Sequence, residues 1–336
     1  MRRMTLYILL GIIVSITIAG IAFLHQPSFG RLPKGERLER IKRSPNYREG
    51  VFRNIDTTIL MTSHKSRLSG IWSFLFRKVE GLRPDEPIPA IKTDLRKIPL
   101  EENALVWFGH SSYLLQVDEK RILVDPVFCM ASPVSFVNKP FRGTEIYSPD
   151  DIPDIDYLVI SHDHWDHLDY HTVKQLKGRI GKVVCPLGVG EHFEHWGFDK
   201  SRIIELDWKE SATLSQQFII HCLPSRHFSG RGLTPNQTLW ASFLLETPDR
   251  KIFIGGDGGY GSHLKQIGEQ FPDIDLAILE NGQYNENWKY IHTMPSLLEQ
   301  TIKDLGVHRV LTVHHSKYAL CLLYTSPSPR DGLLSR

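Results

Sequence analysis

The sequence predicts one layered α/β domain over roughly residues 100–320, preceded by a single N-terminal transmembrane helix. Three observations predict this organisation: an uncharged apolar run near the N-terminus, a series of short apolar runs separated by turn residues from about Glu101, and helical stretches between some of these runs. With 41% hydrophobic residues and a net charge of +2, the chain is not a disordered acidic protein, a collagen-like fibre or a polytopic membrane protein. The four cysteines form no Cys-x-x-Cys pair, which argues against a disulfide scaffold or a cysteine zinc finger.

The first apolar run extends from Met4 to Leu24 without a charged residue and follows Arg2 and Arg3. At about 1.5 Å per residue, a helix of this length reaches roughly 30 Å, the thickness of a bilayer core. A cleaved signal peptide has a shorter apolar stretch of roughly 7–15 residues and a better cleavage site than the one at residues 19–22. We therefore expect residues 1–30 to form an uncleaved, single-pass membrane anchor. Basic residues flank both ends of the run, so the side of the membrane on which the domain lies stays open.

Residues 31–99 are expected to form a basic linker and pre-domain segment. The first 100 residues carry 18 basic and 8 acidic side chains, whereas the remainder has a net charge of −8. The basic stretch from Arg31 to Arg53 fits either a contact with anionic lipid headgroups or a solvated linker. The aromatic and apolar residues 71–76 fit either a membrane-facing or acyl-binding lid or a plain core helix.

From about Glu101 the sequence predicts short strands and helices. Residues 113–117 and 121–124 are expected to form a hairpin around a turn at 118–120. Further strands are expected over Val106–Phe108, Tyr157–Ile160, Lys182–Cys185, Phe218–Leu223, Ser242–Leu245, Lys251–Ile254, Leu276–Leu279 and Arg309–Val313. Helices are expected over His171–Leu176, His263–Phe271 and Pro295–Leu305. The chain contains no repeat and no low-complexity block, which favours a single domain.

A dense group of metal-binding residue types follows the strand expected at 157–160. Residues 162–167 read His-Asp-His-Trp-Asp-His, an HxHxDH pattern that chance produces about once in several hundred chains of this composition. Because the chain turns where the strand ends, His162 and His164 can face one point. Imidazole and carboxylate groups at this density suit zinc or a similar first-row metal, with Asp166 and His167 aimed at a second ion. Two complete sites need further ligands from elsewhere in the chain.

Three further candidate ligands lie at strand ends. His227 follows the strand expected at 218–223, Asp257 follows the strand at 251–254 within a glycine-rich turn, and His314 follows the strand at 309–313. A single histidine at a strand end more often makes a structural hydrogen bond. Four coincident strand-end placements, counting the cluster, favour a metal centre instead.

This set of residues resembles the metallo-β-lactamase superfamily over about residues 100–320. Within it the sequence is most similar to the branch of the N-acylphosphatidylethanolamine-hydrolysing phospholipase D and the ascorbate-6-phosphate lactonases. The motifs that carry this similarity are Trp-Phe-Gly-His-Ser-Ser at 107–112, Asp-Pro at 125–126 and Asn-Trp-Lys-Tyr-Ile-His at 287–292. The resemblance implies an αββα sandwich, a metal-dependent hydrolase and two zinc ions per chain, with other divalent metals as alternatives.

The resemblance also implies a role for each candidate ligand. One metal is held by His162, His164 and His227, the second is held by Asp166, His167 and His314, and Asp257 bridges the two. The alternative to His314 is His315. We choose His314 because the preceding strand is uninterrupted and because the branch places its ligand first in this segment.

The residues around the ligands are expected to support them. His110 and Asp125 also lie at strand ends and are expected to orient the ligating imidazoles. Direct catalytic roles are expected for Asp166, Asp257 and His292. His292 resembles the substrate-phosphate contact of the branch, and a plain surface histidine is its alternative.

The expected chemistry follows from two cations held a few ångströms apart, which would lower the pKa of a bridging water, supply hydroxide and stabilise charge on a phosphoryl or carbonyl oxygen. We therefore expect a membrane-anchored dinuclear zinc hydrolase, a phosphodiesterase of the phospholipase D type that acts on a phospholipid or a small phosphodiester. The alternatives are a lactonase or other ester hydrolase with the same metals, and a mononuclear iron redox module.

Several function classes are not expected. The sequence has neither a GxSxG elbow nor a GxxxxGK[ST] loop, so serine catalysis and nucleotide hydrolysis are excluded. It also leaves no room for the large insertion of the nucleases in this superfamily, so a nucleic-acid partner is not expected. The oligomeric state stays open.

Residues 321–336 are expected to be a tail outside the domain. After residues 314–320 the family resemblance implies a helix that packs on the sheet. The run from Cys321 to Arg336 instead resembles translated sequencing-adapter sequence, and we interpret it as an artefact.

Overall fold

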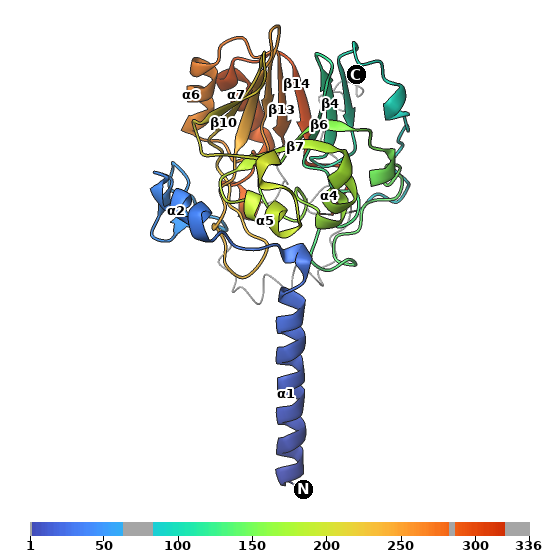
Figure 1. The fold of residues 1–336 in the computed structure, drawn as a ribbon, viewed down its shortest axis with the longest axis vertical. Coiled ribbons are helices and arrows are strands. Elements are labelled where there is room, and N and C mark those ends of the chain that lie inside the picture. The colour runs from blue at the N-terminus through green and yellow to red at the C-terminus, as the bar shows by residue number, and fades with distance from the viewer. Residues whose placement is uncertain (1, 63–82, 282–285, 320–336) are drawn as a thin grey trace.

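The computed structural model describes residues 2–62, 83–281 and 286–319 (Figure 1). Two six-stranded sheets lie face to face, short helices cover their outer faces, and helix α1 (Arg2–Leu24) extends away from them. This arrangement confirms the αββα sandwich that the sequence predicts. The aromatic residues 71–76 and the tail at 321–336 lie outside the described residues.

The first sheet has the strand order β3-β4-β5-β6-β7-β8. Its strands are β3 (Ala104–Trp107), β4 (Tyr113–Val117), β5 (Lys120–Val124), β6 (Ile155–Val159), β7 (Ile180–Pro186) and β8 (Ile203–Leu206). The first three strands pair antiparallel, and β5 to β8 pair parallel. Helices α4 (Tyr170–Leu176) and α5 (Gly190–His195) follow β6 and β7. The parallel pairing brings the carboxyl ends of β5, β6 and β7 to one edge of the sheet.

The second sheet has the order β9-β10-β11-β12-β13-β14. Its strands are β9 (Ser211–Ser215), β10 (Phe218–Leu223), β11 (Ser242–Glu246), β12 (Lys251–Ile254), β13 (Leu276–Glu280) and β14 (Val310–Val313). The last three strands are parallel neighbours, so their carboxyl ends also share an edge. Helices α6 (Ser262–Gln270) and α7 (Pro295–Leu305) pack on the outer face through a separate apolar cluster that includes Leu264 and Leu305.

The main core lies between the two sheets. Tyr113 and Val159 from the first sheet meet Phe243 and Ile252 from the second, and the fully buried Trp240 packs among them. Alternating side chains of β4 and β5 point to this core or to the helix-covered face, as the period of two in a strand requires. The ten expected strands and three expected helices are all present, with ends that differ by at most two residues.

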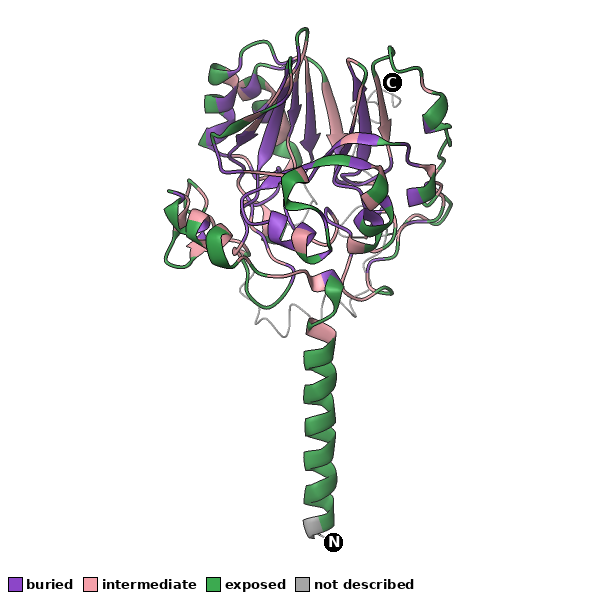
Figure 2. Cartoon of the chain, in the orientation of Figure 1, coloured by how far each residue is buried: buried purple, intermediate pink, exposed green. Residues whose placement is uncertain are grey.

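Helix α1 is exposed from Met4 to Ala22, and only its last two residues, Phe23 and Leu24, are partly buried (Figure 2). Residues Met4–Leu24 have a mean hydropathy of 2.5, and none of this span is buried. Length and composition therefore allow the helix to cross a membrane, and a signal sequence meets the same description.

The segment after α1 packs on the domain instead of forming a free linker. It contains the short 3-10 helix η1 (Pro27–Phe29) and helix α2 (Gly35–Arg43). The Arg37 guanidinium donates hydrogen bonds to Glu191, Glu194 and Glu205 at 2.5–2.6 Å, and Arg31 contacts Glu191 at 2.5 Å. For the stretch Arg31–Arg53 the sequence allowed either a contact with lipid headgroups or a solvated linker. Arg37 does neither, because carboxylates of α5 and β8 neutralise its charge.

Candidate metal centre

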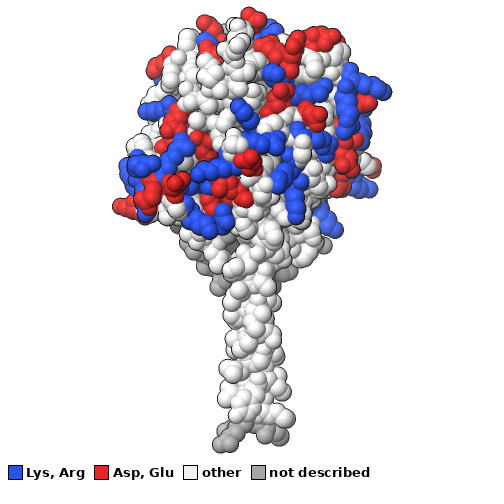
Figure 3. Space-filling model, viewed as in Figure 1, with Lys and Arg blue, Asp and Glu red and all other residues white. Residues whose placement is uncertain are grey.

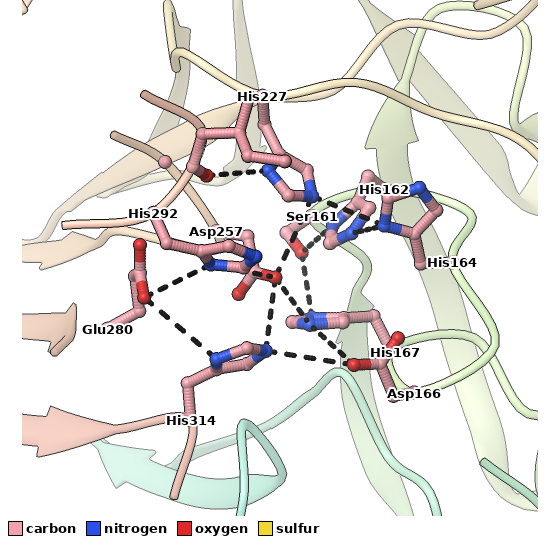
Figure 4. A network of polar contacts seen from close by, with 12 residues as sticks. Ser161, His162, His164, Asp166, His167, His227, Asp257, Glu280, His292 and His314 are labelled. Atoms are coloured by element: carbon pink, nitrogen blue, oxygen red, sulfur yellow. Dashed lines mark hydrogen bonds and ion pairs between the residues drawn. The ribbon is translucent and has the colours of Figure 1, made fainter. Parts of the chain in front are cut away.

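The predicted metal ligands meet at one edge of the sandwich. They follow the carboxyl ends of β6, β10, β12 and β14, and Figure 4 shows their side chains pointing toward one another from both sheets. Helices α4 and α5, which follow β6 and β7 at this edge, lie on the side of the sheets from which α1 extends (Figure 1). The site and the apolar helix are thus on the same side of the domain.

Three histidines bring their ring nitrogens to a common point. Nε2 of His162 lies 2.8 Å, and Nε2 of His227 lies 3.2 Å, from Nδ1 of His164. Nδ1 of His227 donates to the carbonyl oxygen of Ile291 at 2.8 Å, so its proton is on that nitrogen and Nε2 carries a lone pair. Burial lowers the pKa of all three imidazoles, which keeps them neutral. Neutral imidazoles with converging lone pairs are the arrangement that binds a cation.

Asp166, His167 and His314 form a second group beside the first. Oδ2 of Asp166 lies 3.7 Å from Nε2 of His314 and 3.9 Å from Nε2 of His167. Burial opposes a charged imidazole here, yet the nearby carboxylates, Asp257 first among them, raise the pKa of His314 to about 9 and raise that of His167 well above its ordinary value. This group therefore carries protons that a cation would replace.

Asp257 lies between the two groups. Its Oδ2 atom is 3.1 Å from Nε2 of His314, 3.2 Å from Nε2 of His167 and 3.7 Å from Nε2 of His227. Among the described residues, Oδ1 of Asp257 and Nε2 of His167 are buried without a hydrogen-bond partner. Buried polar atoms without partners are costly, and a coordinated cation satisfies both of these atoms. The donor set of imidazole nitrogens and carboxylate oxygens also fits zinc. The residues present therefore fit a dinuclear metal site.

Asp125 orients the candidate ligands through hydrogen bonds. Its Oδ2 atom accepts from Nδ1 of His167 at 2.8 Å and from Oγ of Ser161 at 2.6 Å, as expected for a group that orients an imidazole. The Ser161 oxygen also lies 3.0 Å from Nδ1 of His162, so one carboxylate supports a ligand of each group. Sequence reasoning assigned no role to Ser161, although its position directly before the HxHxDH pattern was available as a signal.

His110 contacts two members of the second group. Its Nε2 atom lies 3.0 Å from Oδ2 of Asp166, and its ring lies 4.1 Å from that of His314. His110, Asp125 and His314 have φ angles of 53°, 41° and 70°, a left-handed backbone that non-glycine residues seldom adopt. The loops of His110 and His314 also hydrogen-bond to each other, because the His314 amide donates to the His110 carbonyl at 2.9 Å. Left-handed backbone that is held in place by hydrogen bonds between loops is typical of functional sites.

The structure separates His314 from its neighbour. His315 turns away from the ligands: its Nδ1 lies 2.7 Å from Oγ of Ser316, and its ring packs 4.8 Å from that of Trp107. Its backbone carbonyl accepts from the His110 amide. The geometry therefore favours His314 over His315 as the ligand.

His292 lies among the predicted ligands and not on the surface. Its ring is 5.1 Å from those of both His227 and His314, and its side chain is 8% exposed. Nδ1 lies 3.3 Å from Oε2 of Glu280, which ends β13 and also accepts from the Thr293 amide. Sequence reasoning missed Glu280, whose signal is that it ends β13 much as Asp257 follows β12.

Comparison with known proteins agrees with this geometry. The family model described as "Beta-lactamase superfamily domain" matches residues 120–315. An uncharacterized protein of Mycobacterium tuberculosis is 38% identical over 287 residues, which cover 83% of this chain and 76% of the relative. N-acyl-phosphatidylethanolamine-hydrolyzing phospholipase D 1 of Caenorhabditis elegans is 30% identical over 244 residues, 68% of this chain and 67% of the relative.

A solved structure shows the same fold. The isothiocyanate hydrolase from Delia radicum gut bacteria superposes with a TM-score of 0.54 at 17% identity, over 69% of this chain and 91% of the other. The family match, the relatives and the fold agree with the resemblance seen in the sequence. The chain therefore belongs to the metallo-β-lactamase superfamily and is a metal-dependent hydrolase of that fold.

Proposed function

We propose that this protein is a membrane-anchored dinuclear zinc hydrolase that cleaves a phosphodiester bond of a phospholipid. The observation that carries the proposal is the sharing of Asp257 between two ligand groups at the sandwich edge that faces α1. The phospholipase D name of the Caenorhabditis elegans relative supports a phosphodiester substrate for this chain.

In this proposal every predicted ligand has one task. One zinc would be held by His162, His164 and His227, the other by Asp166, His167 and His314, and both by Asp257. Bound zinc lowers the pKa of a coordinated water and stabilises negative charge on a phosphoryl oxygen.

The protein's own groups prepare that chemistry. The Asp125 carboxylate and the Ser161 hydroxyl hold His167 and His162 in position. The Oδ1 atom of Asp257, which is buried without a hydrogen-bond partner in the protein, would be satisfied by a bound cation. His292 is placed beside both ligand groups, where it can donate a hydrogen bond to a phosphate oxygen, and Glu280 holds its ring.

The membrane part of the proposal depends on α1. The uncharged span Met4–Leu24 of this helix has 21 residues, none of them buried, and is long enough to cross a bilayer. Retention of this helix would keep the domain at the bilayer surface, on whichever side it lies, and would give the site access to lipid headgroups.

The experiment compares two adjacent histidines in the full-length protein in detergent. Zinc and iron per chain are measured by elemental analysis, and rates are measured on bis-p-nitrophenyl phosphate and on a lactone. We expect about two zinc ions and diester cleavage in the unaltered protein. His314→Gln should lose metal and at least about 100-fold in rate, because it removes a ligand, whereas His315→Gln should keep both.

Three results would contradict the proposal. One iron per chain would indicate a redox module, and two zinc ions with lactone opening only would indicate an ester hydrolase. Equal losses in the two histidine variants would show that this strand end does not supply a specific ligand.

A further inference from the structure

A cavity of about 230 Å³ lies where α1 meets the domain, apart from the predicted metal ligands. Its walls come from Leu24 at the end of α1, from Phe29 and Leu32 just after it, and from the loop at 230–237 between β10 and β11. Its floor is formed by Asp163, His192 and Arg231. A helix that is exposed from Met4 to Ala22 thus ends in the wall of a cavity.

The polar groups on the floor are already satisfied by the protein. Asp163 accepts hydrogen bonds from the Gly230 amide at 2.7 Å and from Thr238 Oγ1 at 2.9 Å, and it lies 3.1 Å from Nε2 of His192. Nδ1 of His192 accepts from the backbone amide of Arg31 at 3.1 Å. A polar ligand is not needed to satisfy these groups, because each buried polar group already has a hydrogen-bond partner in the protein.

Arg231 is satisfied in the same way. Its guanidinium donates to the backbone carbonyl oxygens of Ser28, Asp163 and Leu168 at 2.6–3.1 Å. It also lies 4.2 Å above the ring of Trp165, a cation–π contact. Its charge is therefore spread over carbonyls and an aromatic face and is not directed at a ligand anion.

The walls are mostly apolar; Thr234 and Gln237 are their polar side chains, and the Gln237 amide already donates to the Gly50 carbonyl at 3.0 Å. Leu24, Phe29, Leu32 and Leu233 supply the apolar side chains, and Leu233 is 82% exposed at its position in the loop. Gly232 contributes no side chain, and a Cβ atom placed there would meet only the Phe29 ring, at 3.8 Å. In Figure 3 the surface where α1 joins the domain is mostly without Lys, Arg, Asp and Glu, whereas both acidic and basic residues cover the rest of the visible face.

We propose that this cavity binds one acyl chain of a bilayer phospholipid. An apolar occupant fits because the polar groups of the floor are satisfied and the walls are mostly hydrocarbon and aromatic. The membrane is its source because the same Leu24 that lines the cavity ends the 21-residue apolar span Met4–Leu24. The inference rests on the membrane anchoring in the proposed function and is independent of the proposed reaction.

The bound chain would support the metal-binding turn. Asp163 of the cavity floor lies between the candidate ligands His162 and His164. Trp165 follows in the same turn, and its ring is 5.0 Å from that of Phe29 in the cavity wall. An acyl chain against Phe29 would therefore pack behind this turn, and its headgroup would stay at the membrane surface beside the domain.

The test labels the cavity directly and does not depend on turnover. The full-length protein is placed in phosphatidylcholine vesicles that contain a phosphatidylcholine with a photoreactive diazirine at the end of one acyl chain, and the cross-linked residues are mapped after irradiation. We expect labels on residues 230–234 and on α1. Gly232→Phe fills the cavity and should lower the label on 230–234 at least fivefold, with no change on α1.

A matched glycine provides the control. Gly178 lies in the 3-10 helix η4 (Lys177–Arg179), is not part of the cavity lining, and has nothing within 4 Å of an added Cβ atom. Gly178→Phe should leave all labels unchanged. Leu233→Ser, a change at an exposed position, should lower the label on 230–234 about threefold and serves as the second variant if Gly232→Phe does not fold.

Three outcomes would overturn the inference: equal labelling of residues 230–234 and 177–179, an unchanged label in both Gly232→Phe and Leu233→Ser, or no label on α1. Labelling of 230–234 supports the acyl site whether or not the same sample cleaves a diester, so a failure of the proposed reaction is distinguishable.

Discussion

Arg37 offers a quantitative test of how the segment after α1 is attached. Its side chain is 9% exposed and contacts three carboxylates, Glu191 and Glu194 of α5 and Glu205 of β8. Arg37→Met keeps most of the apolar stem and removes the charge. The three carboxylates are 154–168 residues away from Arg37 in the sequence. The substitution therefore tests how firmly α2 is attached to the domain, and not the helix propensity of α2.

The structure sets the expected size of the effect. Glu194 is 24% exposed and regains water, Glu191 keeps Arg31 at 2.5 Å, and Oε1 of Glu205 keeps the amides of Gly188 and Gly190. The cost therefore comes from one oxygen of Glu191 and one of Glu205, both in buried side chains. Removing one partner of a buried ion pair costs about 3–5 kcal/mol, so we expect about 3 kcal/mol, the lower end of this range.

The assay is urea unfolding of the metal-loaded, full-length protein in detergent, with the free energy of unfolding taken from the linear dependence on urea. Arg40→Met in the same helix is the control, because Arg40 and its partner Glu210 are 39% and 47% exposed. Exposed pairs contribute about 0.2–1 kcal/mol. A loss below about 1 kcal/mol for Arg37→Met, or equal losses in the two variants, would refute the reasoning.

Three further predictions concern the site and the termini of the domain. Asp257→Ala should remove metal and abolish activity, and near-normal turnover with one metal per chain would contradict the shared-ligand arrangement. Deletion of residues 1–24 should leave the domain folded, whereas deletion of 1–30 should lower the free energy of unfolding by about 1–3 kcal/mol more, because Arg231 loses the Ser28 carbonyl; equal stabilities would disprove this. Burial lowers the pKa of Lys317 from 10.5 to about 8. Between pH 8 and 10.5 the lysine is therefore protonated in the unfolded chain and neutral in the folded one. The free energy of unfolding should rise by about 3 kcal/mol over this pH range. Urea unfolding of Lys317→Met should lack this rise, and equal pH dependence in both proteins would contradict it.

Local pattern was enough to predict the elements that hold the site. Strand β4 has the predicted bounds, Tyr113–Val117, because its apolar side chains are needed on both faces, against the other sheet and against the helices. The candidate ligands could be collected from the sequence because parallel strands end at a common edge, so a polar residue after each strand lands in the same place. His227 and His314 are 87 positions apart in the chain and still meet Asp257.

Features that depend on distant partners could not be predicted in this way. Strand β9 reads Ser-Ala-Thr-Leu-Ser and lies at the edge of its sheet, where few apolar side chains are needed. Helix α5 has only six residues and is stabilised by the packing of Phe193 and by the pairing of its acids with Arg37. The end of β13 marks Glu280 as a candidate in the sequence, but its partner His292 is known only from the structure, where β13 lies between β12 and β14.

The attachment of α1 bears on which substrates can reach the site. The ring of Phe23 in α1 is 5.2 Å from that of Phe29, and Phe29 is 5.0 Å from Trp165 in the HxHxDH turn. Arg37 holds α2 on the domain, and Arg231 holds Ser28, only four residues after the end of α1. If α1 spans the membrane as proposed, these contacts place the candidate metal centre close to the bilayer surface. A lipid headgroup in that surface would meet the site without a change of domain orientation, whereas a soluble diester would gain nothing from the anchor. Loosening the junction should therefore slow hydrolysis of vesicle lipid more than that of a soluble diester, and equal slowing would indicate that the junction serves folding alone.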